Sequence, residues 1–172
     1  MRAVLQLRLT DREGRVVATR RAANTVLVSG AQLIAGLFRG EGGPITHMGV
    51  GTSDADADDV TVIALANLAV GDEAALVGET LAPIAADAFR VENDDVRRVV
   101  RVRVRGTLPA AAAVGRVRES GLISRADGGG GGAPADTLYN RVTFAPIDKG
   151  DDHELTLFWE IEFPFGDLQW LS

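Results

Sequence analysis

The chain has 172 residues, a formal net charge of −6 and no cysteine. Its length fits one domain with a sizeable core, and its 46% hydrophobic and 24% charged content is typical of a globular protein. The absence of cysteine excludes disulfides and thiolate metal sites. A pI of about 4.9 disfavours binding of nucleic acid through a general positive field.

The N-terminal part predicts a β-hairpin followed by one helix. Apolar residues alternate with polar ones over 3–9, turn residues follow at 11–14, and 15–20 forms the returning strand. Asn24 is a candidate N-cap, after which apolar residues at helical spacing predict an amphipathic helix from about Thr25 to Phe38. The 2–9 stretch alternates instead of forming an apolar signal core, and no run approaches the roughly 20 apolar residues of a membrane helix. We therefore expect no signal peptide and no membrane span.

The middle of the chain is less regular. Residues 45–51 read as a short strand in which Gly49 and Gly51 favour a bulge or close backbone approach. Residues 53–87 form an acidic, alanine-rich insert, with a short helix expected near 60–68. This insert is expected either to cover the sheet or to lie between subunits.

Four further strands are expected at 96–106, 114–123, 138–144 and 154–163, the last ending at Pro164. Five consecutive glycines, at 128–132, predict a flexible exposed loop over 127–136. Together these elements predict a mainly β protein, with one antiparallel β-sandwich-like domain spanning 1–172 and a single N-terminal amphipathic helix packed on the sheet.

Two of the expected strands carry opposite charges on one face. Arginines recur with the two-residue period of a half-buried strand at 97, 101, 103 and 105, and glutamates recur at 154, 160 and 162. Opposite charges facing each other across a strand pair contribute about 0.2–1 kcal/mol each and help to fix register, either within one sheet or between neighbouring subunits. Phe158, on the otherwise polar face, is expected at an intersubunit contact. The candidate interface residues are Arg97, Arg101, Arg103, Arg105, Glu154, Phe158, Glu160 and Glu162.

The motifs that resemble catalytic or metal sites are incomplete. Asp54–Asp59 alternates carboxylates like the first half of a calcium loop, but Asp59 and Leu65 stand where Gly and Glu are needed, which favours a solvated acidic loop. His47 and His153 have no metal-binding spacing. Glu160 and Glu162, about 7 Å apart on a strand face, match a glycosidase pair by spacing alone. We expect no enzyme activity, no cofactor and no metal.

Five segments within residues 24–163, taken in their order along the chain, resemble a known protein family. They are N-T-V-L-V-S-G-A-Q-L-I-A-G-L (24–37), I-T-H-M-G-V-G-T (45–52), R-V-R-E-S-G-L-I (116–123), L-Y-N-R-V-T-F-A-P-I-D-K (138–149) and E-L-T-L-F-W-E-I-E-F (154–163). In this combination they resemble a family of small structural proteins of tailed bacteriophages. Members are described as tail, tail-fibre or baseplate-associated proteins and also occur in phage-like contractile particles.

The resemblance implies a structural subunit of a virion or phage-like particle, assembled in the bacterial cytoplasm. Its implied partners are further copies of itself and other tail, baseplate or fibre proteins, without nucleic acid, and no catalytic residue is carried over. The acidic insert and the glycine loop depart from the family pattern. They support an alternative, a carbohydrate- or host-surface-binding module whose partner is a host-surface glycan. A hydrolase using Glu160 or Glu162 ranks last.

Overall fold

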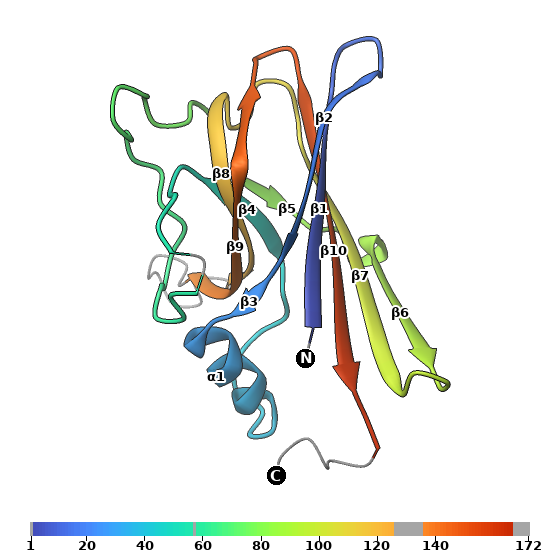
Figure 1. Ribbon diagram of the computed structural model, residues 1–172. Helices are drawn as coiled ribbons and strands as arrows, with labels where there is room; N and C mark the ends of the chain where they lie inside the picture. The colour runs from blue at the N-terminus through green and yellow to red at the C-terminus, as the bar shows by residue number, and fades with distance from the viewer. Residues whose placement is uncertain (1, 57, 126–135, 167–172) are drawn as a thin grey trace.

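The computed structural model describes residues 2–56, 58–125 and 136–166, and in it two five-stranded antiparallel sheets pack face to face (Figure 1). Sheet A has the order β2-β1-β10-β7-β6, and sheet B has the order β3-β9-β8-β4-β5. The predicted mainly β, sandwich-like fold with one helix is confirmed. The strands of sheet A are β1 (Arg2–Thr10), β2 (Val16–Ala23), β6 (Phe89–Asp94), β7 (Val99–Leu108) and β10 (Glu154–Pro164); those of sheet B are β3 (Thr25–Val26), β4 (His47–Gly51), β5 (Leu81–Pro83), β8 (Gly115–Arg125) and β9 (Asp136–Lys149).

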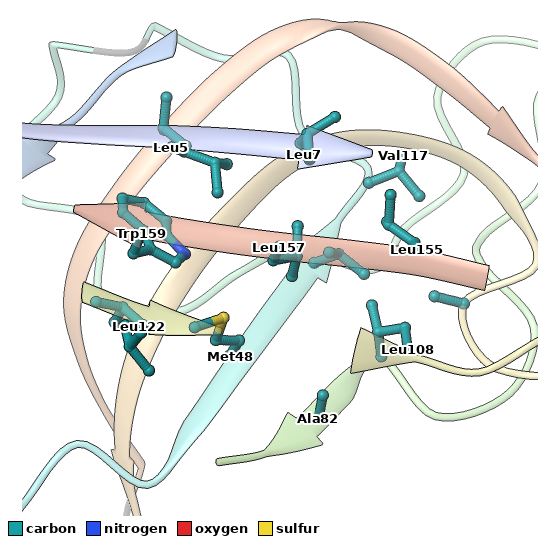
Figure 2. Close-up of a cluster of buried hydrophobic side chains, with 14 of the residues drawn as sticks. Leu5, Leu7, Met48, Ala82, Leu108, Val117, Leu122, Leu155, Leu157 and Trp159 are labelled. Carbon is teal, nitrogen blue, oxygen red and sulfur yellow. The ribbon is translucent and has the colours of Figure 1, made fainter. Parts of the chain in front are cut away.

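The main core lies between the sheets. Alternate residues of β1 and β10, such as Leu5, Leu157 and Trp159, point inward and meet Met48 and Leu122 of sheet B (Figure 2). All five side chains are at most 1% exposed. Since burying one such side chain contributes roughly 1.5–3 kcal/mol, the period-two pattern of these strands fixes which face of sheet A is internal. The other face of sheet A is left for polar and charged side chains.

The predicted opening hairpin is confirmed, and its turn is built by Asp11. The Asp11 carboxylate accepts hydrogen bonds from the backbone N–H groups of Glu13 and Arg15, at 3.1 and 2.9 Å. Gly14 takes a φ of +79°, which glycine adopts without strain. The hairpin places β2 at one edge of sheet A.

The helix α1 (Val28–Leu37) begins three residues later than predicted. Thr25 and Val26 pair with Arg141 and Asn140 of β9 as strand β3, so the backbone there is held in a ladder instead of a helical turn. The prediction that Asn24 is the N-cap is therefore wrong; Leu27 holds that position without a side-chain cap. As predicted, the helix packs on a sheet, and its Ser29 hydroxyl donates to the Leu138 carbonyl of β9 at 2.5 Å.

The acidic insert lies along the outer face of sheet B, the first of the two predicted locations, and its residues Leu81–Pro83 form the edge strand β5. In Figure 1 its teal and green trace runs along the side of sheet B away from sheet A. A second apolar cluster, Leu27, Ile123 and Leu138, is buried there, and Leu65 of the insert packs against it. The helix predicted near 60–68 is wrong: within the described residues this stretch contains no helix. The 3₁₀ helix η1 (Ala86–Ala88) ends the insert, and the five glycines at 128–132 lie outside the described residues.

Candidate functional site on the outer face of sheet A

The predicted charge rows lie on neighbouring strands of one sheet. β7 pairs with β10 so that Arg101 is opposite Glu162 and Arg103 is opposite Glu160. The Arg103 Nε and Glu160 Oε2 atoms are 2.7 Å apart, and the Arg101 Nη2 and Glu162 Oε1 atoms are 3.2 Å apart. Arg97 lies before β7 and reaches Glu162 at 2.7 Å. The sequence left open whether these ion pairs form within one sheet or between subunits, and in the structure they form within one sheet.

The pairing affects protonation of both partners. Burial raises the pKa of Glu162, but the hydrogen bond from Arg101 and the charge of Arg97 outweigh it, and the pKa lies below its ordinary value. The hydrogen bond to Glu160 raises the pKa of Arg103. The charge ladder, Arg97, Arg101, Arg103, Glu160 and Glu162, braces β7 against β10.

Glu154 does not belong to this ladder. It lies opposite Thr10 of β1, and β7 has already ended, because its last residue, Leu108, pairs with Leu155. Among the described residues no arginine or lysine forms an ion pair with Glu154. Its contact within the described part of the chain is a 3.4 Å hydrogen bond from the Thr156 hydroxyl.

Phe158 sits between arginines from two different strands. It lies opposite Arg105 of β7 on one side and Gln6 of β1 on the other. The guanidinium carbons of Arg8 and Arg105 are 5.7 and 5.9 Å from the centre of its ring, within the range of cation–π attraction. The predicted apolar contact residue therefore holds two cations on the face of its own sheet.

These groups line a hollow of about 640 Å³ on the outer face of sheet A, which we call the arginine groove. Arg21 reaches it from β2, where it is paired with Gln6, and Arg90 reaches it from β6, where it is paired with Arg103. Like charges directly opposite each other on a sheet are destabilising, so the Arg90 and Arg103 pair has an energetic cost in the isolated chain. The charged and aromatic residues of the groove are Arg8, Arg21, Arg90, Arg103, Arg105, Phe158, Trp159 and Glu160.

Most of the positive charge in the groove is not neutralised. Glu160 is its single acidic lining residue against five arginines, and it is bound to Arg103. Within residues 2–56, 58–125 and 136–166, no ion pair involves the other four: Arg8, Arg21, Arg90 or Arg105. The groove thus has four more positive than negative charges in a chain of net charge −6. It is suited to hold anionic groups by charge-assisted, bidentate hydrogen bonds.

Sequence reasoning found one half of this site. Arg103, Arg105, Phe158 and Glu160 were predicted from strand parity, whereas Arg8, Arg21 and Arg90 were missed. Of these three arginines, only Arg8 lies in a stretch whose alternating pattern shows that it faces outward. The three come together in space because of the strand order of sheet A, in which they lie on β1, β2 and β6.

The acidic loop, defined by Asp54, Asp56, Asp58 and Asp59, lies on the other side of the sandwich. The Asp56 carboxylate accepts the N–H of Asp58 at 2.9 Å, and Asp59 accepts both the N–H and the hydroxyl of Thr61, which lowers its pKa. All four aspartates are exposed, and no ion pair to them is found in the described part of the chain. The described residues contain no group of three or more acidic or histidine side chains able to hold a metal ion.

A buried ion pair holds this loop in place. Glu119 and Arg141 are each 1% exposed, with Arg141 Nε 2.6 Å from Glu119 Oε2. Arg141 also donates to the carbonyl of Asp56 at 2.9 Å, while Glu119 accepts the N–H of Ala66 at 2.7 Å. Arg141 therefore fixes the acidic loop to sheet B through its backbone carbonyls, and Glu119 fixes the later part of the insert at Ala66.

The two histidines lie apart from each other, and each is close to a polar side chain of the residue that precedes it. The Nδ1 atom of His47 is 2.9 Å from the Thr46 hydroxyl, and burial lowers its pKa. His153 lies 2.7 Å from Asp152 in the turn before β10. Neither lines the arginine groove.

Comparison of the chain with protein-family models, with curated proteins and with solved structures gave no match. No helix in the described part of the chain has the length and apolar content needed to cross a bilayer.

Proposed function

We propose that this chain is a non-enzymatic assembly subunit of a tailed bacteriophage or a phage-tail-like particle, acting by oligomerisation and docking. The observation that carries the proposal is the arginine groove: a preformed, positively charged recess on the rigid face of a sandwich whose own acidic groups leave it unneutralised. Complementary charged surfaces of this kind direct association and register between subunits. The assignment to a phage or phage-like particle rests on the sequence resemblance over residues 24–163.

The groove also favours docking over sugar binding. Carbohydrate sites stack sugar rings on exposed aromatic faces, whereas the two aromatic residues lining the groove offer none: Trp159 is 1% exposed, and Phe158 already has two guanidinium groups over its ring. An acidic protein surface can pair with the guanidinium groups directly, because carboxylates fit the planar fork of arginine.

The proposal is tested by locating the protein in the cell that produces it. Particles released from a culture expressing a tagged chain are separated by sedimentation and analysed by mass spectrometry. We expect the protein in the particle fraction at a fixed ratio to the tail-tube proteins, with a tagged cytoplasmic enzyme as the control that remains in the supernatant. Recovery only in the supernatant would contradict the assembly role. Binding of the purified protein to host-surface glycans instead would favour the surface-binding alternative.

A further inference from the structure

The arginine groove needs a partner that supplies several negative charges over a short span. Its four excess positive charges come from strands at both ends of sheet A, with Arg21 on β2 and Arg90 on β6. These strands are four spacings apart, about 19 Å. A single small anion would neutralise one end only, so the groove fits a ligand that carries several anionic groups.

A long polyanion is disfavoured by the rest of the molecule. Since the groove carries an excess of four positive charges and the chain carries −6, all other residues together carry a formal −10. A nucleic acid that extends beyond the groove would meet this negative surface. A short acidic protein segment, confined to the groove, would not.

The chain itself contains such a segment. Building on the proposed assembly role, we propose that the arginine groove of one copy binds the acidic loop of a second copy. The acidic loop offers four exposed carboxylates, without ion pairs in the described part of the chain, against the four excess positive charges of the groove. Its charge matches that of the groove, and Arg141 fixes it to sheet B through the carbonyls of Ala55 and Asp56.

The placement of the two surfaces determines the kind of assembly. The groove is on the outer face of sheet A. The insert that carries the acidic loop runs along sheet B, on the opposite side of the sandwich (Figure 1). A copy that uses its groove still presents its loop. The contact is therefore heterologous, and it continues from copy to copy into a ring or a filament instead of ending at a dimer.

A charge-exchange experiment tests this contact. One variant removes the excess positive charge of the groove (Arg21→Glu with Arg105→Glu), and the other removes the net negative charge of the loop (Asp54→Lys with Asp58→Lys), at positions whose side chains make no described hydrogen bond. Light scattering at 0.1 M salt should show that wild type associates, that each variant alone is monomeric with at least tenfold weaker association, and that an equimolar mixture of the two variants forms a heterodimer through its one remaining native contact. At 1 M salt all assemblies should dissociate, because the Debye length falls from about 10 to 3 Å.

Matched controls change the same charges elsewhere. Arg12→Glu and Asp72→Lys lie outside both surfaces and should leave association unchanged, and circular dichroism checks that every variant is folded. A wild-type chain that stays monomeric at 0.1 M salt, or variants that fail to assemble on mixing, would overturn the proposal. Binding of a labelled single-stranded oligonucleotide by wild type, lost in the groove variant, would assign the groove to nucleic acid.

The two proposals fail separately. Presence in sedimented particles without self-association through this contact would leave the assembly role standing and reject the loop-in-groove contact. Charge-exchange assembly without recovery in particles would support the contact and reject the particle role.

Discussion

At the scale of single residues, the burial of Tyr139 can be measured directly, because Tyr139 is the chain's single tyrosine. Its side chain is 3% exposed, and burial raises its pKa to about 12. In the unfolded chain the phenol titrates near pH 10. The folded state therefore favours the protonated form, and this contribution to stability is complete below pH 10 and is lost as the pH rises through 12.

We expect absorbance at 295 nm to show the phenol of the folded protein ionising about two pH units above that of the protein in guanidinium chloride. The free energy of unfolding should fall between pH 10 and 12, and Tyr139→Phe should flatten that fall. A folded protein whose tyrosine ionises near pH 10 would contradict the burial seen here.

Gly51 is required by the close approach of the acidic insert to sheet B. A Cβ atom at this position would lie 2.4 Å from the Ala66 carbonyl oxygen and 2.4 Å from Glu119 Oε1. The Ala66 oxygen belongs to the backbone, and the Glu119 carboxylate is fixed by its buried ion pair with Arg141. Moving either atom aside would therefore lower the stability of the fold. This close approach was expected from the glycines of the predicted strand at 45–51.

We expect Gly51→Ala to lower the free energy of unfolding by about 1–3 kcal/mol, the usual range for overpacking a well-packed site. Urea denaturation measures the change. Gly43→Ala is the matched control, because its Cβ would meet only the Ser124 hydroxyl at 3.3 Å. Equal effects of the two substitutions would show that Gly51 is not a close-contact site.

At the scale of elements, the charge ladder joins β7 to β10. Arg101 and Glu162 are 15% and 12% exposed, so their pair is better shielded from solvent than the outer ones. Arg101→Glu should lower the thermal midpoint by several degrees, because the new carboxylate faces Glu160, Glu162 and Asp94. Adding Glu162→Arg should recover part of the loss, since the pair re-forms while Arg97 then meets a like charge. Additive effects in differential scanning calorimetry would argue against a direct pair.

Elements with a strong local pattern could be predicted from the sequence. The strands β1, β7 and β10 alternate over most of their length, and one residue of slip would expose their core side chains. β6 was not predicted, because its sequence, F-R-V-E-N-D, has two apolar residues and serves as an edge strand. β9 runs past Pro146, since the missing N–H falls near a register shift opposite β8.

Tertiary context overrode local signals elsewhere. Asn24 and Thr25 have the chemistry of a helix start, but pairing of Thr25 with Arg141 provided the backbone with ladder hydrogen bonds. The helix expected near 60–68 gives way to an irregular path because that stretch lies on sheet B and bonds to buried side chains. The arginine groove depends on β1 lying between β2 and β10, and no local pattern indicates strand order.

At the scale of the whole molecule, the sandwich has two parts that differ in how they are held. The ten strands share a continuous core, whereas the part of the acidic insert before β5 is joined to the sandwich by separate backbone hydrogen bonds, such as Thr52 N–H to the Ala66 carbonyl, and by side-chain hydrogen bonds. The N–H groups of Ala66, Leu68 and Leu76 are bound to Glu119, Thr52 and Asn67, respectively. Regions with such limited attachment open at a lower free energy than the core does.

Arg141→Met separates these two parts. It leaves Glu119 buried without its partner, and breaking a buried ion pair costs about 3–5 kcal/mol. If the insert opens as a unit, hydrogen exchange of the Ala66 and Leu68 amides should accelerate by more than tenfold, while β1 and β10 amides change only by the global loss of stability. Arg125→Met, which removes a more exposed pair with Asp136, is the control and should leave the insert protected. Uniform acceleration over both sheets would show that the insert and the sandwich unfold together, and that the acidic loop is as rigid as the groove it is proposed to enter.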